Sequence, residues 1–81
     1  MPKIFEWKGY KFFFFSNEGE PPEPCHVHVR KGGSLAKYWV IPEIYLDSSW
    51  GMTTEELNLL EKVVEEYKDL IVEKWNEHFN R

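Results

Sequence analysis

The sequence has few cysteines, few bases relative to acids and no long apolar run, and each shortage excludes a class of protein. Cys25 is the only cysteine among the 81 residues, which excludes an internal disulfide and the zinc sites that need paired cysteines. The opening segment, MPKIFEWKGYK, carries four charges. It therefore has neither the apolar core of a signal peptide nor a stretch that could span a membrane. We expect a cytoplasmic protein that does not associate with membranes.

The shortage of bases also bears on nucleic-acid binding. Ten Lys and Arg stand against 14 Asp and Glu, for a formal net charge of -4. The excess of acid is C-terminal, because residues 1–51 carry six acids and six bases, whereas residues 52–81 carry eight acids and four bases. Between Cys25 and Pro42 there are three bases and no acid. An acidic chain disfavours broad binding of phosphates, so nucleic acid stays open as a partner but is not favoured.

Aromatic residues are plentiful, at 17% of the chain, and they mark the strands. The runs KIFEW and YKFFFFS are separated by Lys8-Gly9, which predicts a hairpin. CHVHVRK and LAKYWVI predict two further strands joined by a glycine turn, and residues 43–46 are candidates for a short edge strand. Residues 17–24 contain three prolines and three glutamates, which predicts an exposed acidic loop.

The last third of the chain predicts helix. Thr53 and Glu56 fit a capping box, and apolar residues then recur every three or four positions up to residue 79. The pattern fits one long helix or two short ones broken near 67–69. We assign residues 47–51 to a loop. The predicted fold is α+β, with one domain over residues 1–81 (1–46 β-rich, 53–79 helical) and a three- to four-stranded antiparallel sheet with the helix packed on one face.

The alternating segment from residue 26 to residue 30 holds the candidate site. Val27 and Val29 point to one face of the strand, and His26, His28 and Arg30 point to the other, which we expect to be the less buried face. Two histidines on alternate residues could contribute to a metal site, but no third ligand is evident, and we predict no metal and no cofactor. Two histidines beside an arginine also supply the base, acid and phosphate clamp of a metal-independent ribonuclease.

A partner-binding surface is the third interpretation of the same strand. The run YKFFFF places aromatic rings on both faces of one strand, and a helix covers only one face of a small sheet. Rings left on the other face would form an exposed apolar patch of the kind that marks interfaces. Trp50, beside a glycine, is a further candidate contact. The predicted binding residues are Phe13, Phe15, His26, His28, Arg30, Lys37 and Trp50; the catalytic candidates are His26, His28 and Arg30.

Three segments taken together resemble a known family over nearly the whole chain. They are MPKIFEWKGYKFFFFSNEGEPPEPCHVHVRKGG, then AKYWVIPEIYL, then EKWNEHF, and they are similar to the bacterial domain-of-unknown-function family 4160 (DUF4160). Cys25 stands where that family usually has a proline. The resemblance implies a small prokaryotic cytoplasmic protein, often encoded beside a second small protein in arrangements that look like toxin-antitoxin or mobile-element modules. It implies no established activity.

The favoured function combines the residues and the resemblance. We expect a protein-binding component of a two-gene, toxin-antitoxin-like module that uses the sheet face around the HVHVR strand. The expected partner is the small protein encoded next to it, and homodimer formation is left open. The alternatives are the ribonuclease-like toxin and metal binding through His26 and His28. Catalysis is not favoured, and no catalytic residue is assigned.

Overall fold

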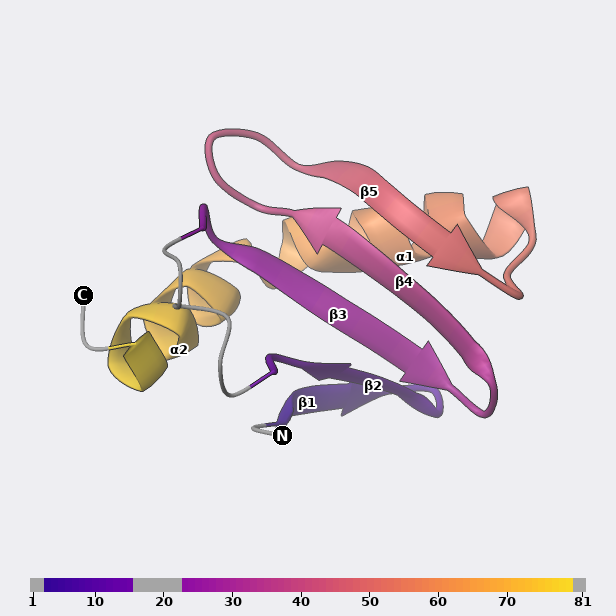
Figure 1. Ribbon diagram of the computed structural model, residues 1–81, viewed down its shortest axis with the longest axis horizontal. Coiled ribbons are helices and arrows are strands. Elements are labelled where there is room, and N and C mark those ends of the chain that lie inside the picture. Colours follow the sequence, from indigo (N-terminus) through magenta and orange to yellow (C-terminus); the bar gives the residue numbers. More distant parts are fainter. Residues whose placement is uncertain (1–2, 16–22, 80–81) are drawn as a thin grey trace.

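The first half of the chain forms an antiparallel sheet in which neighbours along the chain are also neighbours in the sheet (Figure 1). The computed structural model describes residues 3–15 and 23–79. Within them the strands are β1 (Lys3–Trp7), β2 (Tyr10–Phe13), β3 (His26–Lys31), β4 (Ser34–Trp39) and β5 (Tyr45–Trp50). The α+β class is confirmed. The predicted count of three or four strands is too low, because the described residues contain five.

The fifth strand corrects the predicted loop at residues 47–51. Residues 45–50 pair with β4, and the register shifts at Lys37/Tyr38, which accommodates one extra residue in β5. Asp47, Ser48 and Ser49 have low strand propensity, so their sequence shows no strand pattern. Pairing with β4 outweighs that preference, and Trp50 becomes the cross-strand partner of Leu35.

The predicted hairpin between the two aromatic runs is confirmed. β1 and β2 pair with Trp7 opposite Tyr10, and the two residues between them have positive φ, 47° at Lys8 and 85° at Gly9. This is the backbone of a two-residue turn whose twist matches that of the flanking strands. Glycine adopts such a φ without steric cost, which explains why the short turn is favoured here.

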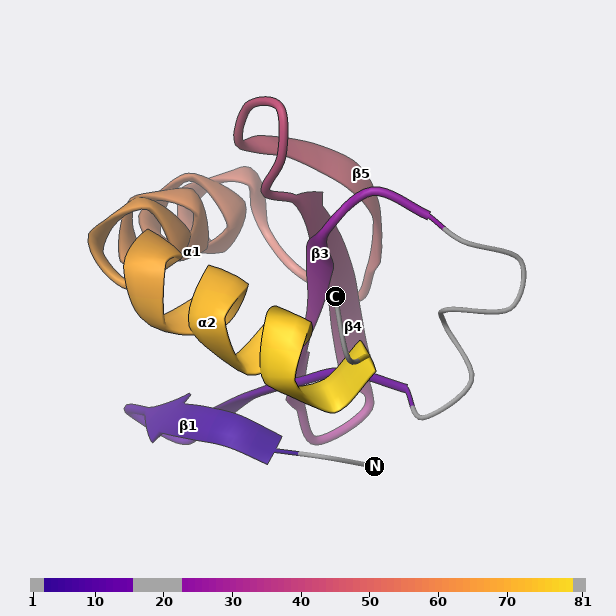
Figure 2. The same ribbon diagram turned by 90° about the vertical axis from the view of Figure 1, so that its left-hand side faces the viewer.

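The C-terminal third forms two helices, which is the second of the two predicted alternatives. They are α1 (Thr54–Glu66) and α2 (Lys68–Phe79), with Tyr67 between them. Thr53 is the N-cap of α1, and its side chain and that of Glu56 complete the predicted capping box. Both helices lie on the same side of the sheet (Figure 2). Neither helix is long and apolar enough to cross a membrane, among the residues described.

The core lies between the sheet and the two helices. Two hydroxyl groups join the layers: Tyr10 donates to the Glu56 carboxylate at 2.7 Å, and Tyr38 donates to the Leu57 carbonyl at 2.6 Å. Leu59 of α1 lies outside this core and is 48% exposed. The strands supply Tyr10, Phe12, Val27, Val29, Ala36 and Tyr38, adjoining residues supply Phe14, Cys25 and Val40, and the helices supply Leu60, Val63, Val64, Ile71 and Trp75.

Candidate functional site

The candidate site is the sheet face opposite the helices, which we call the outer face. In Figure 1 this face is turned toward the viewer and α1 lies behind the sheet. Strand pairing orders its side chains in rows across the sheet, since partners in register share a face. The first row is Lys11, Arg30, Leu35 and Trp50; the second is Phe13, His28, Lys37 and Ser48; the third begins with His26 and Trp39.

The centre of the outer face is buried, which corrects one expectation. His26 is 0% exposed, His28 8% and Phe13 3%, although their position on the alternating strands predicted a less buried face. The alternation itself is confirmed, because Val27 and Val29 belong to the core on the inner face. These three rings are therefore packed components of the fold, and little of their surface is accessible to a ligand.

Aromatic rings enclose His26 at the end of β3. Its ring centroid lies 5.3 Å from that of Trp39 and 5.0 Å from that of Trp75, which α2 brings to this end of the sheet. The Nδ1 atom is 2.9 Å from the carbonyl oxygen of Pro24. A carbonyl only accepts hydrogen bonds, so Nδ1 carries the proton and donates it. Packing and the hydrogen bond together fix the orientation of this imidazole.

Phenylalanines surround His28 in a similar way. The rings of Phe13 and Phe15 lie 5.6 Å and 4.5 Å from its centroid, and the ring of His26 lies at 5.3 Å. The guanidinium of Arg30 lies 5.7 Å from the Phe13 ring centroid, within the range of a cation–π contact. The predicted residues Phe13, Phe15, His26, His28 and Arg30 are thus one contiguous cluster, in which Arg30 is exposed.

The other two predicted binding residues lie further along the sheet, on β4 and β5. Lys37 is half-buried, with its ammonium 4.4 Å from the Trp39 ring centroid and 3.5 Å from the Glu23 carboxylate. Trp50 is 73% exposed and lies opposite Leu35, which is 36% exposed. The structure therefore places Trp50 on the same face as the histidine cluster, separated from it by β4.

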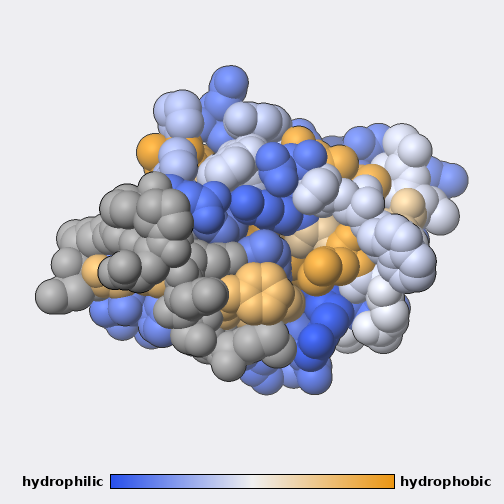
Figure 3. Space-filling model, in the orientation of Figure 1, coloured by the Kyte–Doolittle hydropathy of each residue, from blue (hydrophilic) through white to orange (hydrophobic). Residues whose placement is uncertain are grey.

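Two hollows lie on this face, one on each side of the histidine cluster. The first, which we call the Trp50 hollow, has a volume of about 180 Å³ and is lined by His28, Leu35, Ala36, Lys37, Ser48, Ser49 and Trp50. The second, which we call the basic hollow, also measures about 180 Å³ and is lined by Lys3, Lys11, Phe13 and Arg30. Figure 3, in the orientation of Figure 1, shows hydrophobic atoms over the middle of the sheet with hydrophilic atoms around them.

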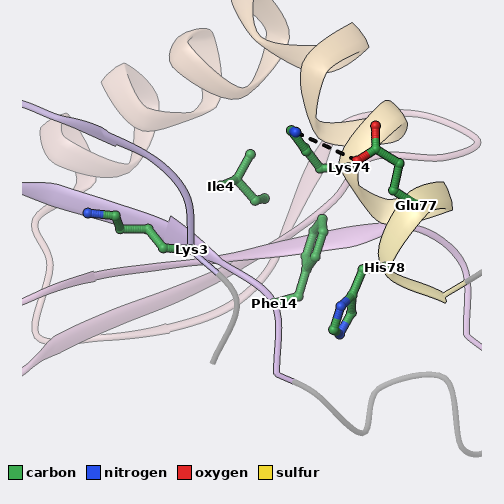
Figure 4. Close-up of a pocket in the computed structure, with 6 residues that line it drawn as sticks. All are labelled: Lys3, Ile4, Phe14, Lys74, Glu77 and His78. Atoms are coloured by element: carbon green, nitrogen blue, oxygen red, sulfur yellow. Dashed lines mark ion pairs between the residues drawn. The ribbon is translucent and has the colours of Figure 1, made fainter.

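A third hollow of about 290 Å³ lies between β1 and α2 and is lined by Lys3, Ile4, Phe14, Lys74, Glu77 and His78 (Figure 4). The Lys74 ammonium is 3.6 Å from the Glu77 carboxylate, so the polar side of this hollow is largely neutralised. His78 stacks on Phe14 at 6.3 Å. None of the predicted site residues lines this hollow.

Cys25 belongs to the core on the inner face, together with Val27 and Val29. Burial raises the pKa of its thiol to about 12. The thiolate is the reactive form of cysteine, so at neutral pH this side chain behaves as a small apolar core residue. Among residues 3–15 and 23–79 no group of three or more His, Cys, Asp or Glu side chains is placed to hold a metal ion.

Sequence reasoning missed three residues of this face, namely Lys3, Lys11 and Leu35. Leu35 was assigned only to a strand, because nothing marked residue 50 as its pairing partner. Lys3 and Lys11 join Arg30 only through the register of three strands. The signal that could have found Lys11 is its alternation with Phe12, since the hairpin at Lys8-Gly9 fixes which residues of β2 face outward.

Comparison with known proteins gives one match. No curated protein and no solved structure matches the chain. The model of a family described as a domain of unknown function (DUF4160) matches residues 9–76, a range that includes most of the sheet and both helices up to Asn76. The chain therefore belongs to the DUF4160 family.

Proposed function

We propose that this protein binds a small protein partner through the outer face of its sheet, as one component of a two-gene, toxin-antitoxin-like module in the bacterial cytoplasm. The observation that carries the proposal is the exposed pair Trp50 and Leu35 beside the Trp50 hollow. Tryptophan is enriched among the residues that dominate binding energy at interfaces.

The buried cluster beside Trp50 supports the same proposal. His28 packs against Phe13 and His26, and His26 packs against Trp39, so this row of rings forms a packed base beside the exposed residues. A preorganised surface loses little entropy when a partner docks. The predicted contacts thus divide into exposed ones (Trp50 and Arg30), half-buried ones (Phe15 and Lys37) and buried ones that hold the surface in place (Phe13, His26 and His28).

Capture of the small protein encoded beside this gene tests the proposal. Trp50→Ala is expected to weaken capture about 30-fold or more, which is the effect of removing an interface residue of the dominant class. Leu59→Ala is the matched control, because Leu59 is exposed on α1, away from the sheet. Wild-type capture by Trp50→Ala, or equal loss in both variants, contradicts binding through this face.

The ribonuclease hypothesis stays a prediction. His26 and His28 lie side by side with Arg30 on the same strand, but both imidazoles are buried, and a phosphodiester would have to reach them. The test of this hypothesis is the growth of a bacterial host after induction of the wild-type protein or of the folded His26→Ala/His28→Ala variant. Arrest by the wild type alone would support catalysis by this strand, and equal growth would argue against it.

A further inference from the structure

The basic hollow and the Trp50 hollow together point to the chemistry of the partner. We propose that the partner inserts an extended segment which places carboxylates in the basic hollow and an apolar side chain against Trp50 and Leu35. This inference rests on the proposed function, because it describes what binds to the same face. Both hollows lie on the outer face, and each measures about 180 Å³, large enough for one side chain.

Charge favours an acidic group in the basic hollow. Lys11 and Arg30 are cross-strand partners and exposed, and neither makes an ion pair with any other described residue. Lys3 is paired with Glu6 at 2.8 Å, and Lys11 also lowers the pKa of Glu6, after the larger effect of Lys3. Counting Glu6 against the three bases leaves a net charge of +2 at this hollow.

The positive charge of the basic hollow contrasts with the negative charge of the helical layer. Residues 54–79 carry eight acids and three bases, so the helical layer has a net charge of 3 − 8 = −5. Such an asymmetry orients an approaching acidic segment toward the outer face and away from the helices. The same field opposes a second copy that approaches with its own outer face, since the two basic hollows would repel each other.

The distance between the two hollows sets the spacing of the acidic and apolar residues in the partner's segment. The basic hollow spans β1, β2 and β3, and the Trp50 hollow spans β3, β4 and β5. Neighbouring strands are about 4.8 Å apart, so the centres of the two hollows, which lie two strands apart, are separated by roughly 10 Å. An extended chain advances about 3.3 Å per residue. The acidic and apolar residues of the partner should therefore be about three positions apart, in a segment that crosses the strands.

An acidic protein segment fits this face better than single-stranded RNA. Proteins that bind such RNA stack bases on exposed aromatic rings along a positive groove. Phe13, the ring in the basic hollow, is 3% exposed and is covered by Arg30, so it offers no stacking surface. Trp50 and Tyr45, 73% and 49% exposed, are rings at the β5 edge of this face, away from the basic hollow, and a net charge of -4 opposes a polyanion at long range.

Amide chemical-shift titrations of the ¹⁵N-labelled full chain test the inference. The probe is a synthetic ten-residue peptide with two adjacent glutamates followed, three positions later, by leucine and phenylalanine; a second peptide has glutamines in place of the glutamates. The acidic peptide is expected to shift the amides of Lys11 and Arg30 and the indole N–H of Trp50. It should bind about tenfold more tightly than the glutamine peptide, because two charge contacts are lost with the latter.

Charge-reversal variants test whether the acidic peptide binds in the basic hollow. Lys11→Glu/Arg30→Glu should weaken the acidic peptide at least tenfold, whereas Lys62→Glu/Lys68→Glu, the same charge change on the helices, should not. Equal affinity of both peptides, no shifts on the outer face, tighter binding of a ten-nucleotide uridine RNA, or shifts that depend on protein concentration alone would each overturn the inference. Partner capture that Trp50→Ala abolishes and Lys11→Glu/Arg30→Glu retains would refute the acidic segment while leaving the proposed function standing.

Discussion

The two faces of the sheet are both buried at their centres, but different groups bury them. On the inner face, Phe12 and Tyr38 are covered by two helices and have no exposed surface. On the outer face, Phe13 and His28 pack on each other, Phe15 packs on His28, and the guanidinium of Arg30 lies 5.7 Å from the Phe13 ring centroid. Long polar side chains bury apolar rings with their stems while their charges remain in water. A sheet face without a helical layer can therefore hold a second, thinner core.

The largest expected effect comes from the inner face. Phe12→Ala removes a fully buried ring that stacks on Phe5 at 4.4 Å, and such substitutions cost about 3–5 kcal/mol. A domain of this length has about 4–12 kcal/mol of stability, so a large fraction of it is lost. Urea unfolding followed by circular dichroism measures the change. A loss below about 1 kcal/mol would mean that the helices do not dock on Phe12 as described.

Sequence patterns predicted the division into two faces but not what covers each of them. Alternation placed Val27 and Val29 inward, and the aromatic run placed rings on both sides of β2, because side-chain direction in a strand has a period of two. The burial of His26 depends on Trp75, which is 49 positions further along the chain, and no local pattern encodes that contact. The candidate edge strand at residues 43–46 overlaps the start of β5, but residues 47–50 were missed for a related reason: pairing with β4, rather than their own propensity, makes them a strand.

The sequence likewise predicted one part of the candidate site and missed another. Strand pairing brings Phe13, Phe15, His26, His28 and Arg30 together as neighbours, and the aromatic and alternating runs had marked all five as candidates. The basic hollow was not predictable, since Lys3 and Lys11 reach Arg30 only through the register of β1, β2 and β3. Register is a property of the assembled sheet, set partly by turns and bulges.

The second prediction applies the same substitution to the outer face. Phe13→Ala is expected to cost about 3 kcal/mol, the lower end of the range for a buried phenylalanine, because charged side chains cover part of this site and can relax into the gap. Urea unfolding of Phe13→Ala beside Phe12→Ala measures both. A cost below about 1 kcal/mol for Phe13→Ala alone would show that the outer face holds no core, and would restore Phe13 as a simple contact residue.

A smaller effect tests how the helical layer begins. Thr53→Ala should cost about 1 kcal/mol, since the threonine hydroxyl accepts a hydrogen bond from the Glu56 N–H at 3.1 Å. The carboxylate of Glu56 accepts a hydrogen bond from the Thr53 N–H and a second from the Tyr10 hydroxyl. These bonds lower the pKa of Glu56, the backbone bond contributing most, so they favour the charged form in the folded state.

The pH dependence of this contribution has a defined sign. A carboxyl with a lowered pKa stabilises the fold above its ordinary value of about 4.3, and the stabilisation is lost as pH falls through the folded-state pKa. Glu56→Gln should therefore lower the urea midpoint at pH 7, with a difference from the wild type that shrinks toward pH 3. Glu55→Gln, one position earlier in the same exposed turn, is the control. A difference that is constant with pH would contradict the role of the charge.

The smallest expected effect on stability belongs to the residue with the largest expected effect on binding. Trp50 is 73% exposed, so Trp50→Ala should change the free energy of unfolding by no more than about 0.5 kcal/mol. Trp75→Ala is the matched comparison, since Trp75 is 4% exposed and packs on Phe14 and His26, and its loss should cost about 3–5 kcal/mol. A cost above about 2 kcal/mol for Trp50→Ala would mean that its ring belongs to the fold. The exposed end of the outer face would then be part of the thin core, and the surface offered to a partner would shrink to the basic hollow.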